Sequence, residues 1–97
     1  MRFVRDPDKN ELNLRERGFD FAFASLIFDG PTLERPDFRR EYGEARVVAI
    51  GLAQGLELTA CYTDRRAVGS DLERRIISAR RSNRRERKAF QEALQAR

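Results

Sequence analysis

Residues 47–63, with the sequence VVAIGLAQGLELTACYT, are the part of the chain that indicates its fold most clearly. Two runs rich in apolar and β-branched residues lie on either side of Gln54-Gly55. This arrangement is typical of a β-hairpin, because glycine adopts the positive φ angles that tight turns require. We therefore predict a hairpin over residues 47–63 at the centre of a sheet.

Short elements are predicted before this hairpin. Asp6-Pro7 is typical of a helix start, and Gly18 is expected to end the polar helix that follows. Residues 21–28 are so apolar that they predict a second helix, buried on most sides. Residues 32–33 are predicted to begin a short strand, and residues 34–43 to form a polar loop.

After the hairpin, one more strand and one helix are predicted. We expect residues 64–71 to form a polar loop, residues 74–77 a strand and residues 80–96 a basic helix. The whole order predicts an α+β fold with a small antiparallel sheet, two N-terminal helices and one basic C-terminal helix. A chain of 97 residues has room for one modest core, so residues 1–97 are expected to form a single domain.

The amino-acid composition excludes several classes of protein. With 40% apolar and 37% charged residues, the chain is too apolar for a disordered tail and too charged to enter a bilayer. It shows no secretory signal, so we expect a cytoplasmic protein without membrane contact. The single cysteine, Cys61, is predicted to be buried. The absence of histidine excludes the usual zinc sites and histidine-based triads, and we expect no metal and no cofactor.

The positive charge is concentrated towards the C-terminus. Residues 1–64 carry nine basic and 12 acidic side chains, whereas residues 65–97 carry 11 basic and four acidic ones. All the cations except Lys9 and Lys88 are arginines, which bind phosphate in a forked geometry. The bias predicts an electropositive face for a polyanion; an arginine-rich genome, or a solvated helix with unpaired arginines, would produce the same pattern.

Several short motifs occur along the chain in a fixed order: Asp6-Pro7-x-Lys9, Gly18-x-x-Phe21, Phe28-x-x-Pro31, Gly43-Glu44-x-Arg46, Tyr62-Thr63 and Arg75-Ile76-Ile77-Ser78-Ala79-Arg80. With them the sequence resembles the BrnT family of bacterial type II toxins over nearly its whole length. The resemblance implies a RelE-like fold, cleavage of RNA, and neutralisation by a BrnA-like antitoxin with a ribbon-helix-helix part. It also implies that the complex binds its operator DNA through the antitoxin and can form higher-order assemblies. Other members commonly carry histidine where this sequence has Arg17.

Candidate catalytic residues follow from the chemistry of RNA cleavage. Without a metal, the 2′-hydroxyl must lose a proton and the charge of the phosphorane must be stabilised. Arg80 and Arg81 are expected to bind an anion where the last strand meets the last helix. Arg65 is predicted to join them, with a salt bridge as the alternative. Lys9 and Glu44 complete the predicted catalytic set; the alternatives are an exposed lysine and a structural ion pair of Glu44.

Further residues are candidates for binding RNA. Arg84, Arg85 and Lys88 are predicted to share one face of the last helix with Arg81, either to position the RNA backbone or to dock an acidic antitoxin segment. Tyr62 is predicted to stack on a base or to lie at the edge of the core. We thus expect a metal-independent endoribonuclease that inhibits translation and growth. The alternative is a non-catalytic module that binds nucleic acid or a partner through the same basic face.

Overall fold

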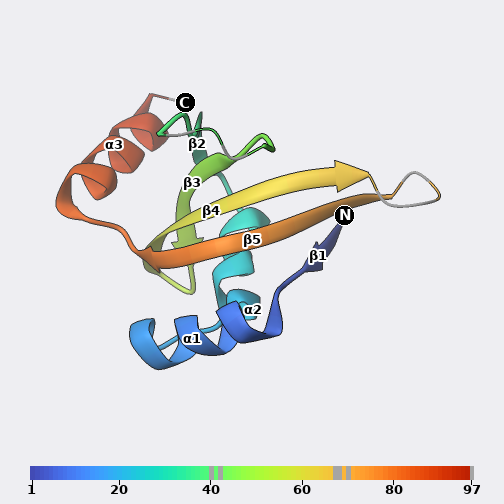
Figure 1. The fold of residues 1–97 in the computed structure, drawn as a ribbon. Helices are drawn as coiled ribbons and strands as arrows, with labels where there is room; N and C mark the ends of the chain where they lie inside the picture. The colour runs from blue at the N-terminus through green and yellow to red at the C-terminus, as the bar shows by residue number, and fades with distance from the viewer. Residues whose placement is uncertain (40, 42, 67–68, 70, 97) are drawn as a thin grey trace.

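The computed structural model describes residues 1–39, 41, 43–66, 69 and 71–96. Within them the chain has the predicted α+β architecture, with a five-stranded sheet in the order β1-β5-β4-β3-β2 (Figure 1). No helix in these residues is long and apolar enough to cross a membrane. The elements are β1 (Arg2–Val4), α1 (Pro7–Arg17), α2 (Phe21–Ala24), the 3₁₀ helix η1 (Ser25–Asp29), β2 (Leu33–Pro36), β3 (Val47–Ala53), β4 (Leu56–Arg66), β5 (Leu72–Arg81) and α3 (Arg84–Gln95).

The predicted central hairpin is confirmed as β3 and β4, which pair antiparallel around Gln54 and Gly55, both with positive φ. Strands β4 and β5 are longer than predicted, and β4 extends through residues 64–66 of the expected polar loop. The physical reason is that oppositely charged residues face each other across the two strands. Asp64 lies opposite Arg74, and their side chains form two hydrogen bonds of 2.8 Å. Cross-strand ion pairs of this kind let charged sequences form strands.

The sheet is mixed, whereas an antiparallel sheet was predicted. Strands β2 to β5 pair antiparallel, but β1 pairs with β5 in parallel. Strand β1 covers only the first part of β5, opposite Glu73, Arg74 and Arg75. The rest of that edge of β5 pairs with no described strand, and α1 packs against it.

The predicted helix over residues 21–28 is divided into the single turn of α2 and the 3₁₀ helix η1. Close approach of this segment to β3 depends on Gly51, where a Cβ atom would lie 2.9 Å from the Cβ of Ile27. The core forms between α2, η1 and one sheet face, and includes Phe21, Leu58 and Ile76. In Figure 1, β5 crosses in front of the helical segment formed by α2 and η1, so the other sheet face is turned towards the viewer.

Helix α3 begins at Arg84, so the prediction of a helix from residue 80 is wrong at its start. Asn83 caps the helix: its side chain accepts the Glu86 N–H at 2.9 Å, while the Glu86 carboxylate accepts the Asn83 N–H at 2.8 Å. Arg80 and Arg81 instead belong to β5, opposite residues of β4. The apolar stripe of the helix is directed inward, with Phe90 only 2% exposed.

A β-bulge in β5 determines which side chains reach the uncovered sheet face. Cys61 pairs with Ser78 but Tyr62 pairs with Ile76, so Ile77 is an extra residue in β5. Because side chains alternate along a strand, this insertion reverses the alternation. Ile76 therefore faces the core beside Tyr62, while Ser78 and Arg80 lie on the uncovered face with the side chains of alternate β4 residues.

Candidate active site

An arginine-lined hollow of about 160 Å³ lies on the uncovered face of the sheet. We call it the arginine hollow. Its four arginines come from four separate parts of the chain: α1, β2, the segment after β2, and β5. The lining residues are Asn13, Arg17, Arg35, Arg39, Val48, Thr59, Cys61, Ser78, Ala79 and Arg80.

Helix α1 forms one wall of the arginine hollow. Asp6 caps its start and Gly18 ends it in the left-handed conformation, as predicted. Asn13 fixes the helix against the free edge of β5: its side chain accepts the Ala79 N–H at 3.4 Å and donates to the Phe19 carbonyl at 2.9 Å. Residues four apart lie on one helix face. Arg17 is therefore beside Asn13, and Lys9 lies one turn before it.

Arg39 is held by a buried carboxylate at the end of β2. The Asp37 side chain has no exposed surface and accepts hydrogen bonds of 2.9 Å from both Nε and Nη2 of Arg39. The Asp37 backbone N–H is itself bound to the Arg46 carbonyl at 2.9 Å. This fork fixes the guanidinium of Arg39 while leaving 72% of its side chain exposed.

Arg80 is held from the opposite side by Glu86 of α3. Nη1 and Nη2 of Arg80 donate to the two carboxylate oxygens at 2.7 and 2.8 Å. These bonds, opposed by burial and helped by the Asn83 N–H, lower the pKa of Glu86 to about 2. Glu86 in turn raises the pKa of Arg80, while the positive charge of Arg39 acts in the opposite direction. The two guanidiniums thus repel each other across the arginine hollow.

The arginine hollow has an excess of positive charge. Two of its arginines, Arg39 and Arg80, are each paired with one carboxylate. Arg17 and Arg35 form no ion pair with any residue that the structure describes. A concave site in which two guanidiniums without a described ion pair lie beside two that carboxylates hold in a forked geometry is suited to binding a phosphate group.

The floor of the arginine hollow is polar but contains no activated thiol. Thr59 and Ser82 share a buried hydrogen bond of 2.8 Å. Cys61 is buried, as predicted, and its thiol donates to Asp37 at 3.9 Å. Burial, followed by the negative charge of Asp37, raises the pKa of Cys61. The thiol is therefore protonated at neutral pH and is a poor nucleophile.

The predicted gathering of Arg65, Arg80 and Arg81 is wrong. Arg80 lies opposite Thr59, six residues along β4 from Arg65, which is about 20 Å in an extended strand. Arg65 is thus near the end of β4 that points away from α1 and α3 (Figure 1), where it is 3.6 Å from Glu73. Arg81 follows Arg80 directly, so its side chain is on the other sheet face.

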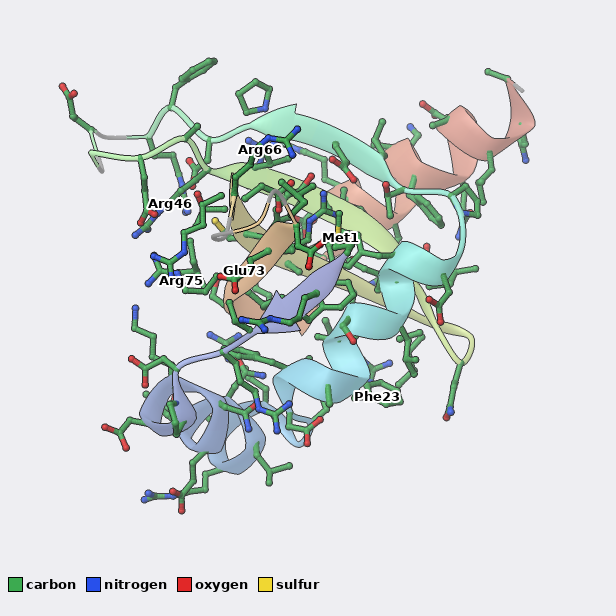
Figure 2. All side chains as sticks on the ribbon, turned by 90° about the vertical axis from the view of Figure 1, so that its right-hand side faces the viewer. Met1, Phe23, Arg46, Arg66, Glu73 and Arg75 are labelled. Carbon is green, nitrogen blue, oxygen red and sulfur yellow. The ribbon has the colours of Figure 1, made fainter. Side chains whose placement is uncertain are left out.

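Glu44 and Tyr62 lie outside the arginine hollow. Glu44 accepts hydrogen bonds from Arg75 at 3.0 Å and from Arg46 at 3.3 Å; Figure 2 shows these two arginines side by side. Burial acts to raise the pKa of Glu44, but Arg46 and Arg75 outweigh it and lower the pKa. Tyr62 is buried in the core and donates to Glu34 at 2.5 Å. Burial and this bond raise the Tyr62 pKa.

The remaining candidates are exposed on helices. Arg84, Arg85 and Lys88 lie on the outer surface of α3, and Lys9 on α1. Arg81 does not share a face with the three α3 residues, because it is in β5. Their roles in binding RNA stay predictions.

The structure adds Arg17, Arg35 and Arg39 to the residues that the sequence indicated. The spacing of Lys9, Asn13 and Arg17 could have identified the helix face, since four-residue intervals mark one side of a helix. Arg35 and Arg39 have no such signal, because residues 34–43 are predicted to form a polar loop, whereas residues 33–36 form β2 in the structure. Only the pairing of β2 with β3 places Arg35 opposite Val48, on the face of the arginine hollow.

Comparison with known proteins identifies one family. Residues 6–86 match the family model described as ribonuclease toxin, BrnT, of type II toxin-antitoxin systems. The match extends from the cap of α1 to the Glu86 carboxylate that holds Arg80. No curated protein matches the chain.

Proposed function

This chain belongs to the BrnT family of ribonuclease toxins of type II toxin–antitoxin systems, and from that premise we propose that its arginine hollow binds the scissile phosphate of RNA. The observation that carries the proposal is the convergence of Arg17, Arg35, Arg39 and Arg80 on one concave surface with excess positive charge. The resemblance supports it further, because Arg17 stands where other members commonly carry histidine.

The proposed chemistry is attack of the ribose 2′-hydroxyl on the adjacent phosphate, with its proton passing to solvent water, and cleavage of the bond from phosphorus to the 5′-oxygen, which takes a proton from water and leaves as a hydroxyl. The arginines stay protonated, so their contribution is to hold the phosphate in line and to stabilise the charge of the phosphorane. Glu86 is a weak base because its pKa is about 2. The rate enhancement therefore comes mainly from electrostatics, and we expect a slow enzyme that functions without a metal.

The biological role is proposed on the same premise. A type II system pairs the toxin with a protein antitoxin, and RNA is the substrate that the family description implies. We propose that cleavage inhibits translation and growth in the cytoplasm. We also propose that the antitoxin is BrnA-like and binds operator DNA within a higher-order complex.

Arg15 and Arg17 provide a matched test of the site. Both are basic residues in the last turn of α1, but residues two apart lie on opposite sides of a helix. The purified chain, freed of antitoxin, should cleave RNA in EDTA and leave a 2′,3′-cyclic or 3′-phosphate end. Arg17→Gln should reduce cleavage about tenfold, equivalent to about 1.4 kcal/mol of lost transition-state stabilisation. Arg15→Gln should cleave like the wild type.

Two results would contradict the proposal. Equal rates of RNA cleavage by Arg17→Gln and Arg15→Gln would show that the arginine hollow takes no part in the reaction. RNA binding that weakens with salt but yields no product would favour the alternative of a non-catalytic binding module.

A further inference from the structure

A second depression, of about 470 Å³, lies beyond the C-terminal end of α1. Its floor is apolar, and we call it the apolar patch: Leu14, Phe19, Phe23 and Leu56. Leu14 is 49% exposed and Leu56 37% exposed. The rings of Phe19 and Phe23 contact each other with centroids 5.9 Å apart. Figure 2 shows Phe23 on the opposite side of the molecule from Arg46 and Arg75.

The rim of the apolar patch is positively charged. Arg17 and Arg81 line it, and neither forms an ion pair with any described residue. Among the described residues that line the depression, Asp20 is the one carboxylate; it is the N-cap of α2 and accepts the Phe23 N–H at 2.9 Å. An apolar floor with two cations at its rim complements a partner that presents apolar side chains next to carboxylates.

We propose that the apolar patch is the docking site of the antitoxin, which contributes an apolar anchor residue flanked by Asp or Glu. Because the chain belongs to a type II toxin–antitoxin family, it has a protein antitoxin as a partner for this surface. The patch favours a protein over RNA because Phe19 and Phe23 pack on each other at a 52° angle and are half-buried. Nucleobases stack on aromatic faces that stand free.

Arg17 connects this docking site with the arginine hollow, because it lines both depressions. A carboxylate of the docked antitoxin would pair with Arg17, which is one of the two arginines of the hollow that form no ion pair with a described residue. Docking would thereby weaken phosphate binding without filling the hollow. This inhibitory step rests on the proposed function, whereas docking at the apolar patch does not.

Leu14 and Leu12 form a matched pair for the test. Both are in α1 and about half exposed, at 49% and 48%, but they lie on opposite sides of the helix and only Leu14 lines the apolar patch. Binding of the cognate antitoxin to the full-length toxin would be measured by titration calorimetry. Leu14→Ser should weaken the affinity at least tenfold, and Leu12→Ser should leave it unchanged. Both variants, free of antitoxin, should cleave RNA at the wild-type rate.

A charge reversal provides a second, independent variant. Arg81→Glu changes a surface residue of β5 and should weaken antitoxin binding at least as much as Leu14→Ser. Antitoxin affinity within twofold of wild type in both variants would overturn the proposal. Conversion of a wild-type toxin dimer to a monomer by Leu14→Ser, with antitoxin affinity unchanged, would also overturn it and assign the apolar patch to a second copy of the chain. If the wild-type toxin cleaves no RNA but Leu14→Ser and Arg81→Glu still weaken antitoxin binding, the proposed docking site is supported and only the proposed function is refuted.

Discussion

Replacing Glu86 by glutamine should have opposite effects on stability and on RNA binding. Glu86 accepts hydrogen bonds of 2.7 and 2.8 Å from Arg80 and a further one from the Asn83 N–H. Glutamine can still complete the capping box of α3, but it removes the charge that neutralises Arg80. The variant therefore loses an ion pair and gains an unneutralised guanidinium in the arginine hollow.

The expected cost in stability follows from the pKa of Glu86, which is lowered from 4.5 to about 2. A difference of this size corresponds to about 3 kcal/mol, and solvent screening at the partly exposed Arg80 reduces it to about 1–2 kcal/mol. For a chain of this length, the melting temperature should fall by roughly 5–10 °C. A lowered pKa stabilises the fold above about pH 4.5, and this contribution is lost as the pH falls towards 2. The difference between wild type and variant should therefore disappear over that range.

Binding should change in the opposite direction. With Arg80 freed, Glu86→Gln should bind a non-cleavable RNA more tightly at low salt. If Arg80 gains one phosphate contact, the slope of log affinity against log salt should steepen by about 0.7. Fluorescence anisotropy over a range of salt concentrations measures this slope, and thermal unfolding from pH 7 to 2 measures the stability. A destabilised variant with unchanged or weaker RNA binding would refute the idea that Glu86 competes with phosphate for Arg80.

Two further substitutions test the fold. Gly51→Ala should destabilise the chain by about 1–3 kcal/mol, because the added Cβ would meet Ile27 at 2.9 Å; Gly30→Ala, where nothing lies within 4 Å, should melt within about a degree of wild type. Asn13→Ala should lower stability by about 1–3 kcal/mol, since it leaves the Phe19 carbonyl without its donor and frees the edge of β5; chemical denaturation measures the loss, and wild-type stability would contradict the anchoring of α1.

The sequence predicted the fold best where the pattern of residues is local. The hairpin of β3 and β4 follows from two runs rich in apolar and β-branched residues around a glycine turn, and α1 follows from its caps at Asp6 and Gly18. The extent of β5 could not be predicted, because its charged half forms a strand only when β4 supplies opposite charges. The start of α3 was misplaced because helix-forming residues before the Asn83 cap belong to a strand that pairs with β4.

Only part of the candidate site could be predicted from the sequence. The sequence indicates Arg80, but the strand register separates it from Arg65 and Arg81, its expected partners. Arg65 is too far along β4, and the alternation of side chains directs Arg81 to the other face. The arginines that do meet Arg80 come from α1 and from around β2. Their convergence depends on tertiary packing, which no short motif encodes.

Binding of RNA in the arginine hollow is tested most directly by protection of a thiol placed in it. Ser78 is exposed and lines the hollow, whereas Arg15 is exposed on the far side of α1. Ser78→Cys and Arg15→Cys would each be made in a Cys61→Ala background, and their alkylation rates measured with and without saturating non-cleavable RNA. We expect RNA to slow alkylation at position 78 at least tenfold and to leave position 15 unchanged. Equal alkylation of Cys at position 78 with and without bound RNA would contradict the account.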